Sequence, residues 1–155
     1  MITDKSFMNI AHIIAEHSSC QRAKVGAIIV KDNSILSIGY NGTPHHWNNK
    51  CEENGVTKPE VIHAEANAIL RCARHGMSSK GTTMYCTHAC CTECAKMIIQ
   101  SGISTFIYDK NYRDEKGIQL LQKADIDVYC TGIWDPFKRC STTTRFGTRP
   151  LHSRL

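Results

Sequence analysis

The chain has 155 residues, of which 41% are hydrophobic and 21% are charged, a length and composition that suit one globular domain with a buried core. No apolar run approaches the roughly 18 residues of a membrane-spanning helix, and the first residues lack the order of a signal peptide, so we expect a cytoplasmic protein with no membrane partner. The formal net charge is +5, but five basic residues and no acidic one follow residue 135, so the preceding body is neutral and does not favour nucleic acid as a partner.

The first elements along the chain are predicted to be a helix, a hairpin and a long loop. Apolar residues from Phe7 to Ile14 recur at helical spacing, and β-rich runs at 25–30 and 35–40 flank a turn signal. Residues 41–60 are polar and contain two prolines, so we expect a loop without regular structure. Loops of that length inside a compact domain are usually functional or disordered.

The rest of the chain alternates helices with strands. The predicted helices are 61–74, 91–101 and 115–124, and the predicted strands are 83–87, 105–108 and 126–129. Such alternation implies crossover connections and a mostly parallel sheet covered by helices. We therefore expect one α/β domain over residues 1–132, followed by a basic tail over 133–155 that is irregular or packs between subunits.

Three residues have the chemistry and spacing of a zinc site. His63 opens one predicted helix, and Cys91 and Cys94 open another with the spacing Cys-x-x-Cys. Two thiolates and an imidazole suit zinc and leave a fourth position for water, which is the catalytic arrangement. The positive end of a helix favours the thiolate form of both cysteines. Glu65, two residues after His63, can move a proton without being a ligand.

This pattern has two other interpretations. In the first, His63 and Glu65 are ordinary first-turn residues and the cysteines are small apolar residues of the core. That explains a lone His-x-Glu, but not one followed about thirty residues later by Cys-x-x-Cys at a helix start. In the second, the zinc is purely structural, which would require a fourth Cys or His instead of Glu. The sequence favours a catalytic zinc.

These motifs resemble the zinc-dependent cytidine deaminase superfamily, and within it the deoxycytidylate (dCMP) deaminases, especially those of phages. The matching stretches are Lys24–Ala27, Gly39–Gly42, His63–Ile69 and Cys91–Ile103, within a resemblance over about residues 5 to 130. The resemblance implies a three-layer α/β/α fold around a mixed five-stranded sheet. It also implies hydrolysis of dCMP to dUMP and ammonia, which supplies the precursor of dTMP.

The resemblance assigns roles to the residues of the zinc motifs. Water activated by a zinc ion on His63, Cys91 and Cys94 attacks C4 of the cytosine ring, Glu65 moves the protons, and the backbone of Ala64 holds the ring. One position departs from the family, which has Pro where this chain has Cys90. Cys91 keeps the family spacing, whereas Cys90 and Cys94 would share a helix face at another spacing, and both pairs remain open.

The substrate's phosphate requires cationic partners, and Arg22, Lys24 and Arg113 are the candidates. By resemblance, Tyr112 closes over the base, Arg113 binds phosphate, and Asn41 bonds to a sugar hydroxyl. The alternatives are that the basic residues are solvated surface charges, that Tyr112 is an interfacial Tyr and that Asn41 is a turn Asn.

Gly39, Tyr40 and Gly42 look like the signature of the regulated members of this family. These members are homo-hexamers activated by dCTP and inhibited by dTTP, with Mg²⁺ accompanying the triphosphate. Asn67 and Arg74 lie on the helix that couples effector to active site in phage relatives. Taken alone, the glycine-rich stretch would predict only a turn.

The chain has nine cysteines, which in an intracellular protein indicate thiols for metal or catalysis sooner than disulfides. Cys20 and Cys51 match two ligands of a second, structural zinc in phage relatives, for which His45 and His46, or else His88, would have to replace two missing histidines. The alternative is that both cysteines are buried thiols. We interpret the remaining four as core or surface thiols, namely Cys72, Cys86, Cys130 and Cys140.

Two other functions are alternatives to the deamination of dCMP. The basic tail favours a deaminase of tRNA or single-stranded DNA, but the neutral body shows no aromatic and basic stacking surface. A non-enzymatic zinc module would have no use for Glu65 beside an open coordination position.

Overall fold

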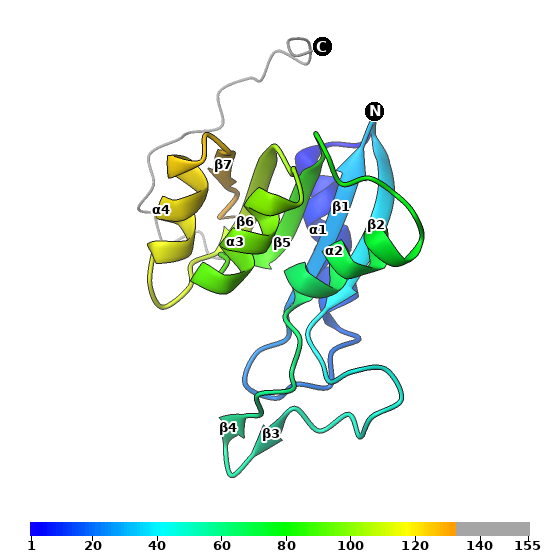
Figure 1. Ribbon diagram of the computed structural model, residues 1–155, viewed down its shortest axis with the longest axis vertical. Helices are drawn as coiled ribbons and strands as arrows, with labels where there is room; N and C mark the ends of the chain where they lie inside the picture. The colour runs from blue at the N-terminus through cyan, green and yellow to red at the C-terminus, as the bar shows by residue number, and fades with distance from the viewer. Residues whose placement is uncertain (133–155) are drawn as a thin grey trace.

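The computed structural model describes residues 1–132, so the predicted tail over 133–155 lies outside the described residues (Figure 1). Its centre is a five-stranded sheet in the order β2-β1-β5-β6-β7. The strands are β1 (Gly26–Lys31), β2 (Ser34–Tyr40), β5 (Thr83–His88), β6 (Thr105–Lys110) and β7 (Asp127–Cys130). β1 is antiparallel to β2 and β5, whereas β5, β6 and β7 are parallel. The prediction of a mixed five-stranded sheet is confirmed.

Helices cover both faces of the sheet, which gives three layers (Figure 1). α1 (Asp4–Ala15) packs on one face, where its Phe7, Met8 and Ala11 join side chains of β1, β5 and β6 in one apolar cluster. α2 (Ala64–Arg74), α3 (Thr92–Gln100) and α4 (Lys116–Lys123) contribute to the larger cluster on the other face. Among residues 1–132, no helix is both long and apolar enough to cross a membrane.

The segment 41–60 contains regular structure that the sequence analysis did not predict. A small hairpin of β3 (Glu52–Glu53) and β4 (Val56–Thr57) projects from one end of the domain (Figure 1). Its turn is Asn54-Gly55, and both residues have positive φ, at 52° and 76°. Asn-Gly between two short strands is a strong hairpin signal, because both residues tolerate left-handed backbone. The prediction of a loop without regular structure was therefore wrong here.

The helices α2 and α3 begin later than predicted, so that a candidate metal ligand stands just before each of them. α2 begins at Ala64, with His63 as an extended N-cap, because Ile62 is held in a β-bridge to Gly42. α3 begins at Thr92, with Cys91 as its extended N-cap, and the Cys91 sulfur accepts the Cys94 amide N–H at 3.5 Å. Both N-caps lie just before a helix, where backbone N–H groups make the local field positive.

Candidate metal centre and its cavity

His63, Cys91 and Cys94 converge at the N-terminal ends of α2 and α3. The His63 Nδ1 atom lies 3.5 Å from the Cys91 sulfur and 3.4 Å from the Cys94 sulfur, and the ligand atoms of this group all lie within 4.8 Å of one another. A tetrahedral zinc ion with bonds of 2.0–2.3 Å holds such ligand atoms about 3.6 Å apart. The three residues therefore fit zinc and leave a fourth position open.

The ionisation of the two cysteines also fits a cation. Hydrogen bonding by the Cys94 thiol, supported by His63, lowers the pKa of Cys91 to about 3. The same hydrogen bond to Cys91, together with burial, raises the pKa of Cys94 far above its usual range. Two adjacent sulfurs thus share one negative charge in the protein alone, whereas a divalent ion stabilises both as thiolates.

Cys90 is not part of this group. Its side chain is fully buried in the apolar cluster under α3 and α4, and burial raises the pKa of its thiol well above the usual range. Its sulfur is not among the converging ligand atoms, which belong to His63, Cys91 and Cys94. The geometry therefore supports the pair Cys91 and Cys94.

Glu65 lies in the first turn of α2, two residues after His63, and only 4% of it is exposed. Burial raises its pKa to about 7, partly offset by a backbone hydrogen bond and the charge of His63. A carboxyl group with a pKa near neutrality both accepts and releases protons readily. Its position beside the metal ligands suits proton transfer.

A cavity of about 620 Å³ opens from the metal ligands, within the size range of small-molecule sites. His63, Ala64, Glu65 and Cys91 line it at the metal end. The wall also includes Arg22, Asn41, His88, Tyr112 and Arg113, which come from four separate segments. Most of the residues predicted to bind substrate are therefore brought together around one cavity.

The cationic residues differ in where they point. Arg113 lies against the Tyr112 ring, with its Cζ atom 5.3 Å from the ring centroid. Arg22 donates from Nη1 to the Thr57 hydroxyl at 3.2 Å, at the small hairpin. Lys24 is not in the cavity wall, since its Nζ atom lies 3.5 Å from the Glu16 carbonyl at the end of α1. The prediction that Lys24 contacts phosphate does not agree with this placement.

The Asn41 side chain in the cavity wall is hydrogen-bonded to the backbone of a neighbouring segment. Its side-chain oxygen accepts the Val25 N–H at 2.8 Å, and its Nδ2 donates to the Ala23 carbonyl at 2.9 Å. The side chain therefore fixes the segment that leads into β1. One Nδ2 hydrogen and one lone pair remain for a ligand.

A second cavity, of about 290 Å³, lies between α2 and the segment after β2. Its wall includes four residues predicted from the regulatory signature, namely Tyr40, Gly42, Asn67 and Arg74. The Asn67 amide donates to the Tyr40 carbonyl at 2.9 Å, which ties the two walls together. Gly39 is not in the wall, because it packs under the start of α2.

The expectation of a second zinc on Cys20 and Cys51 is corrected by the structure, which joins these residues in a disulfide. A disulfide sulfur has no thiolate charge to offer a metal. The His45 and His46 rings contact one another at a tilt of 58°, and His88 lines the larger cavity. Among the described residues, the one cluster of three metal-ligating side chains is that of His63.

The expectation of thiols throughout is also wrong for Cys130, which is disulfide-bonded. Cys72 and Cys86 are buried thiols, as expected, while Cys140 lies outside the described residues. The disulfide between Cys20 and Cys51 depends on a contact between segments that are distant in the sequence. The segment 20–22 lies beside the small hairpin, where Glu52 accepts the backbone N–H groups of Gln21 and Arg22.

Comparison with known proteins gives an independent result. Residues 1–110 match the family model of the cytidine and deoxycytidylate deaminase zinc-binding region. Deoxycytidylate deaminase of Enterobacteria phage T4 is 34% identical over 166 residues, covering 79% of this chain and 86% of the phage protein. The enzyme of the same name from Saccharomyces cerevisiae is also 34% identical, but this chain spans only 43% of its length.

A solved structure has the same fold. It is the dCMP deaminase of cyanophage S-TIM5 in complex with dCMP and dUMP, with a TM-score of 0.80 and 41% sequence identity. The match covers 82% of this chain and 95% of the cyanophage chain.

Proposed function

This chain belongs to the family of cytidine and deoxycytidylate deaminases that share a zinc-binding region, and from that membership we propose that it hydrolyses dCMP to dUMP and ammonia. The observation that carries the proposal is the cluster of His63, Cys91 and Cys94 with Glu65 beside it, at one end of a cavity of nucleotide size. The phage relatives named as deoxycytidylate deaminases support the choice of substrate.

The chemistry divides between the cofactor and the chain. His63, Cys91 and Cys94 would hold the zinc, which would supply a hydroxide equivalent at neutral pH by lowering the pKa of its bound water to about 7. Glu65 takes up the proton released from the water and delivers it to N3 of the cytosine ring. It then takes up the remaining proton of the hydroxyl added at C4 and passes it to the departing amino group, so that water and dCMP give dUMP and ammonia.

The helix starts position the reacting ring. Ala64 is the first residue of α2 and Cys91 caps α3, so their backbone N–H groups have no partner within those helices. These groups are suited to donate hydrogen bonds to the reacting ring. Arg113, supported by Tyr112, binds the phosphate, and Arg22 is a second cation in the cavity wall.

The smaller cavity is the proposed effector site. Tyr40, Gly42, Asn67 and Arg74 line it, and Arg71 adds a further cation for a triphosphate accompanied by Mg²⁺. α2 contributes Glu65 to one cavity and Asn67 to the other, so a shift of this helix would couple them. We infer activation by dCTP, inhibition by dTTP and assembly into a homo-hexamer. Leu70 of α2, 56% exposed, is available for a subunit contact.

Initial rates of ammonia release from dCMP and from deoxycytidine, each with and without dCTP and Mg²⁺, test this function. We expect turnover of dCMP but little of deoxycytidine, with an increase on adding dCTP. Equal rates on both substrates would overturn the role of Arg113. An oligomer whose rate ignores dCTP and dTTP would overturn the regulation.

A further inference from the structure

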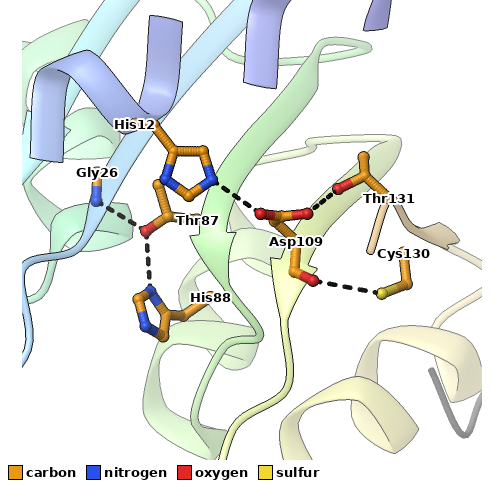
Figure 2. Close-up of polar contacts among 7 residues, drawn as sticks. All are labelled: His12, Gly26, Thr87, His88, Asp109, Cys130 and Thr131. Atoms are coloured by element: carbon orange, nitrogen blue, oxygen red, sulfur yellow. Dashed lines mark hydrogen bonds and ion pairs between the residues drawn. The ribbon is translucent and has the colours of Figure 1, made fainter. Parts of the chain in front are cut away.

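His88 is a polar residue of the larger cavity that neither the metal centre nor the proposed proton transfer uses. It ends β5, three residues before Cys91, and its ring is half-buried in the cavity wall. Figure 2 shows the ring beside Thr87, with its Nδ1 atom 2.9 Å from the Thr87 hydroxyl oxygen. Among the described residues, its Nε2 atom has no hydrogen-bond partner.

The Thr87 hydroxyl fixes which ring nitrogen bears the proton. Thr87 is fully buried, and its oxygen accepts the Gly26 N–H at 3.1 Å (Figure 2). A buried hydroxyl must also donate its own proton, and within residues 1–132 its other contact is His88 Nδ1. Thr87 therefore donates to Nδ1, so the neutral ring has its hydrogen on Nε2.

The surroundings keep this ring neutral. Burial, followed by the positive charges of Lys110 on β6 and His12 on α1, lowers the pKa of His88 to about 4. The charge of Asp109 raises the pKa of His88, but this carboxylate is already hydrogen-bonded to His12 Nε2 at 2.8 Å and to the Thr131 hydroxyl (Figure 2). His88 is thus a neutral N–H donor at ordinary pH.

The register of the sheet places His88 beside the strand that leads to Arg113. His88 of β5 pairs with Lys110, the last residue of the parallel strand β6. The residues that follow β6, namely Asn111, Tyr112 and Arg113, line the same cavity as His88. Besides Glu65, the carboxylates of Glu52, Glu93 and Asp114 line it. A neutral donor is not drawn into ion pairs with these groups, as another cation would be.

We propose that His88 is a phosphate-binding residue of the substrate cavity, which donates its Nε2–H to an oxygen of the nucleotide's 5′-phosphate beside Arg113. The inference deepens the proposed function and rests on it for the identity of the nucleotide. Arg113 supplies charge, whereas His88 supplies one directed hydrogen bond whose geometry is set by Thr87 and Gly26.

Kinetics of zinc-loaded variants test the proposal. His88→Ala should raise the KM for dCMP about tenfold, the loss expected for one hydrogen bond to a charged group, and leave the low kcat/KM for deoxycytidine unchanged. His88→Gln retains an N–H donor and should recover most of the loss. Lys24→Ala is the matched control, since it removes a cation outside the cavity wall. Equal losses on both substrates, or no loss on dCMP, would overturn the proposal.

Binding measurements separate this inference from the reaction itself. Calorimetry with dUMP and deoxyuridine requires no turnover, and His88→Ala should weaken dUMP alone by about tenfold. If the wild-type protein binds dUMP in this way without deaminating dCMP, the proposed function fails and the phosphate contact stands. A nitrogen NMR spectrum with the His88 hydrogen on Nδ1 would contradict the assigned donor.

Discussion

A Cβ atom on Gly39 would lie 2.3 Å from the Ala64 carbonyl oxygen and 2.5 Å from the Ala68 nitrogen. β2 and α2 therefore touch through their backbones at this point. Because His63 and Glu65 flank Ala64, the contact sets the position of a metal ligand and of the proton carrier together. Gly39 thus acts through packing, although the sequence assigned it to the effector site.

Gly39→Ala is expected to push α2 away from the sheet. We expect a loss of about 1–3 kcal/mol in the free energy of unfolding, as for other overpacked sites, together with weaker zinc binding. Urea unfolding and metal analysis measure the two effects. Gly42→Ala is the matched control, because nothing lies within 4 Å of a Cβ there. Equal stability of the two variants would contradict the packing role.

Neighbouring cysteines are expected to differ in their effect on zinc. Cys91→Ala removes a ligand and should abolish stoichiometric zinc binding, whereas Cys90→Ala should retain zinc and lose stability through a core cavity. Metal analysis of the purified variants distinguishes them. Zinc retained by Cys91→Ala and lost by Cys90→Ala would show that the ligand spacing is the other one.

The disulfide between Cys20 and Cys51 predicts one zinc per chain. Without reductant, mass spectrometry after alkylation should find both residues unmodified, and adding reductant should expose two thiols. Reduction should also lower stability, since the bond closes a loop between residues 31 apart. Two zinc ions per chain, with both thiols free, would restore the structural zinc in place of the disulfide.

The lowered pKa of His88 predicts a pH dependence of the free energy of unfolding. The unfolded chain protonates this residue near pH 6.5, but the folded chain does so only near pH 4. Stability should therefore fall as pH decreases from 6.5 towards 4, because only the unfolded state takes up the proton. His88→Gln should show a smaller loss between pH 7 and 5. Parallel losses in the two proteins would mean that the folded state does not depress this pKa.

The features predictable from sequence were those that leave a local pattern. The alternation of helices and strands predicted a mostly parallel sheet, the family resemblance predicted the mixed five-stranded sheet, and the spacing of His63, Cys91 and Cys94 predicted the metal group. The remaining features depend on contacts between distant segments. The sequence predicts Lys24 as a phosphate ligand, but in the fold its Nζ atom lies beside the Glu16 carbonyl at the end of α1. Thr87 fixes the tautomer of His88 because β5 pairs with β1, which brings the Gly26 N–H to the Thr87 hydroxyl oxygen.

The central claim is that Glu65 moves protons at a zinc site formed by His63, Cys91 and Cys94. The most direct measurement compares zinc content and conversion of dCMP to dUMP in the wild-type protein and in Glu65→Gln. We predict equal zinc in both and a loss of at least about a hundredfold in turnover in the variant, because the amide cannot exchange the proton. Substantial turnover by zinc-loaded Glu65→Gln, or none by the zinc-loaded wild type, would contradict the account.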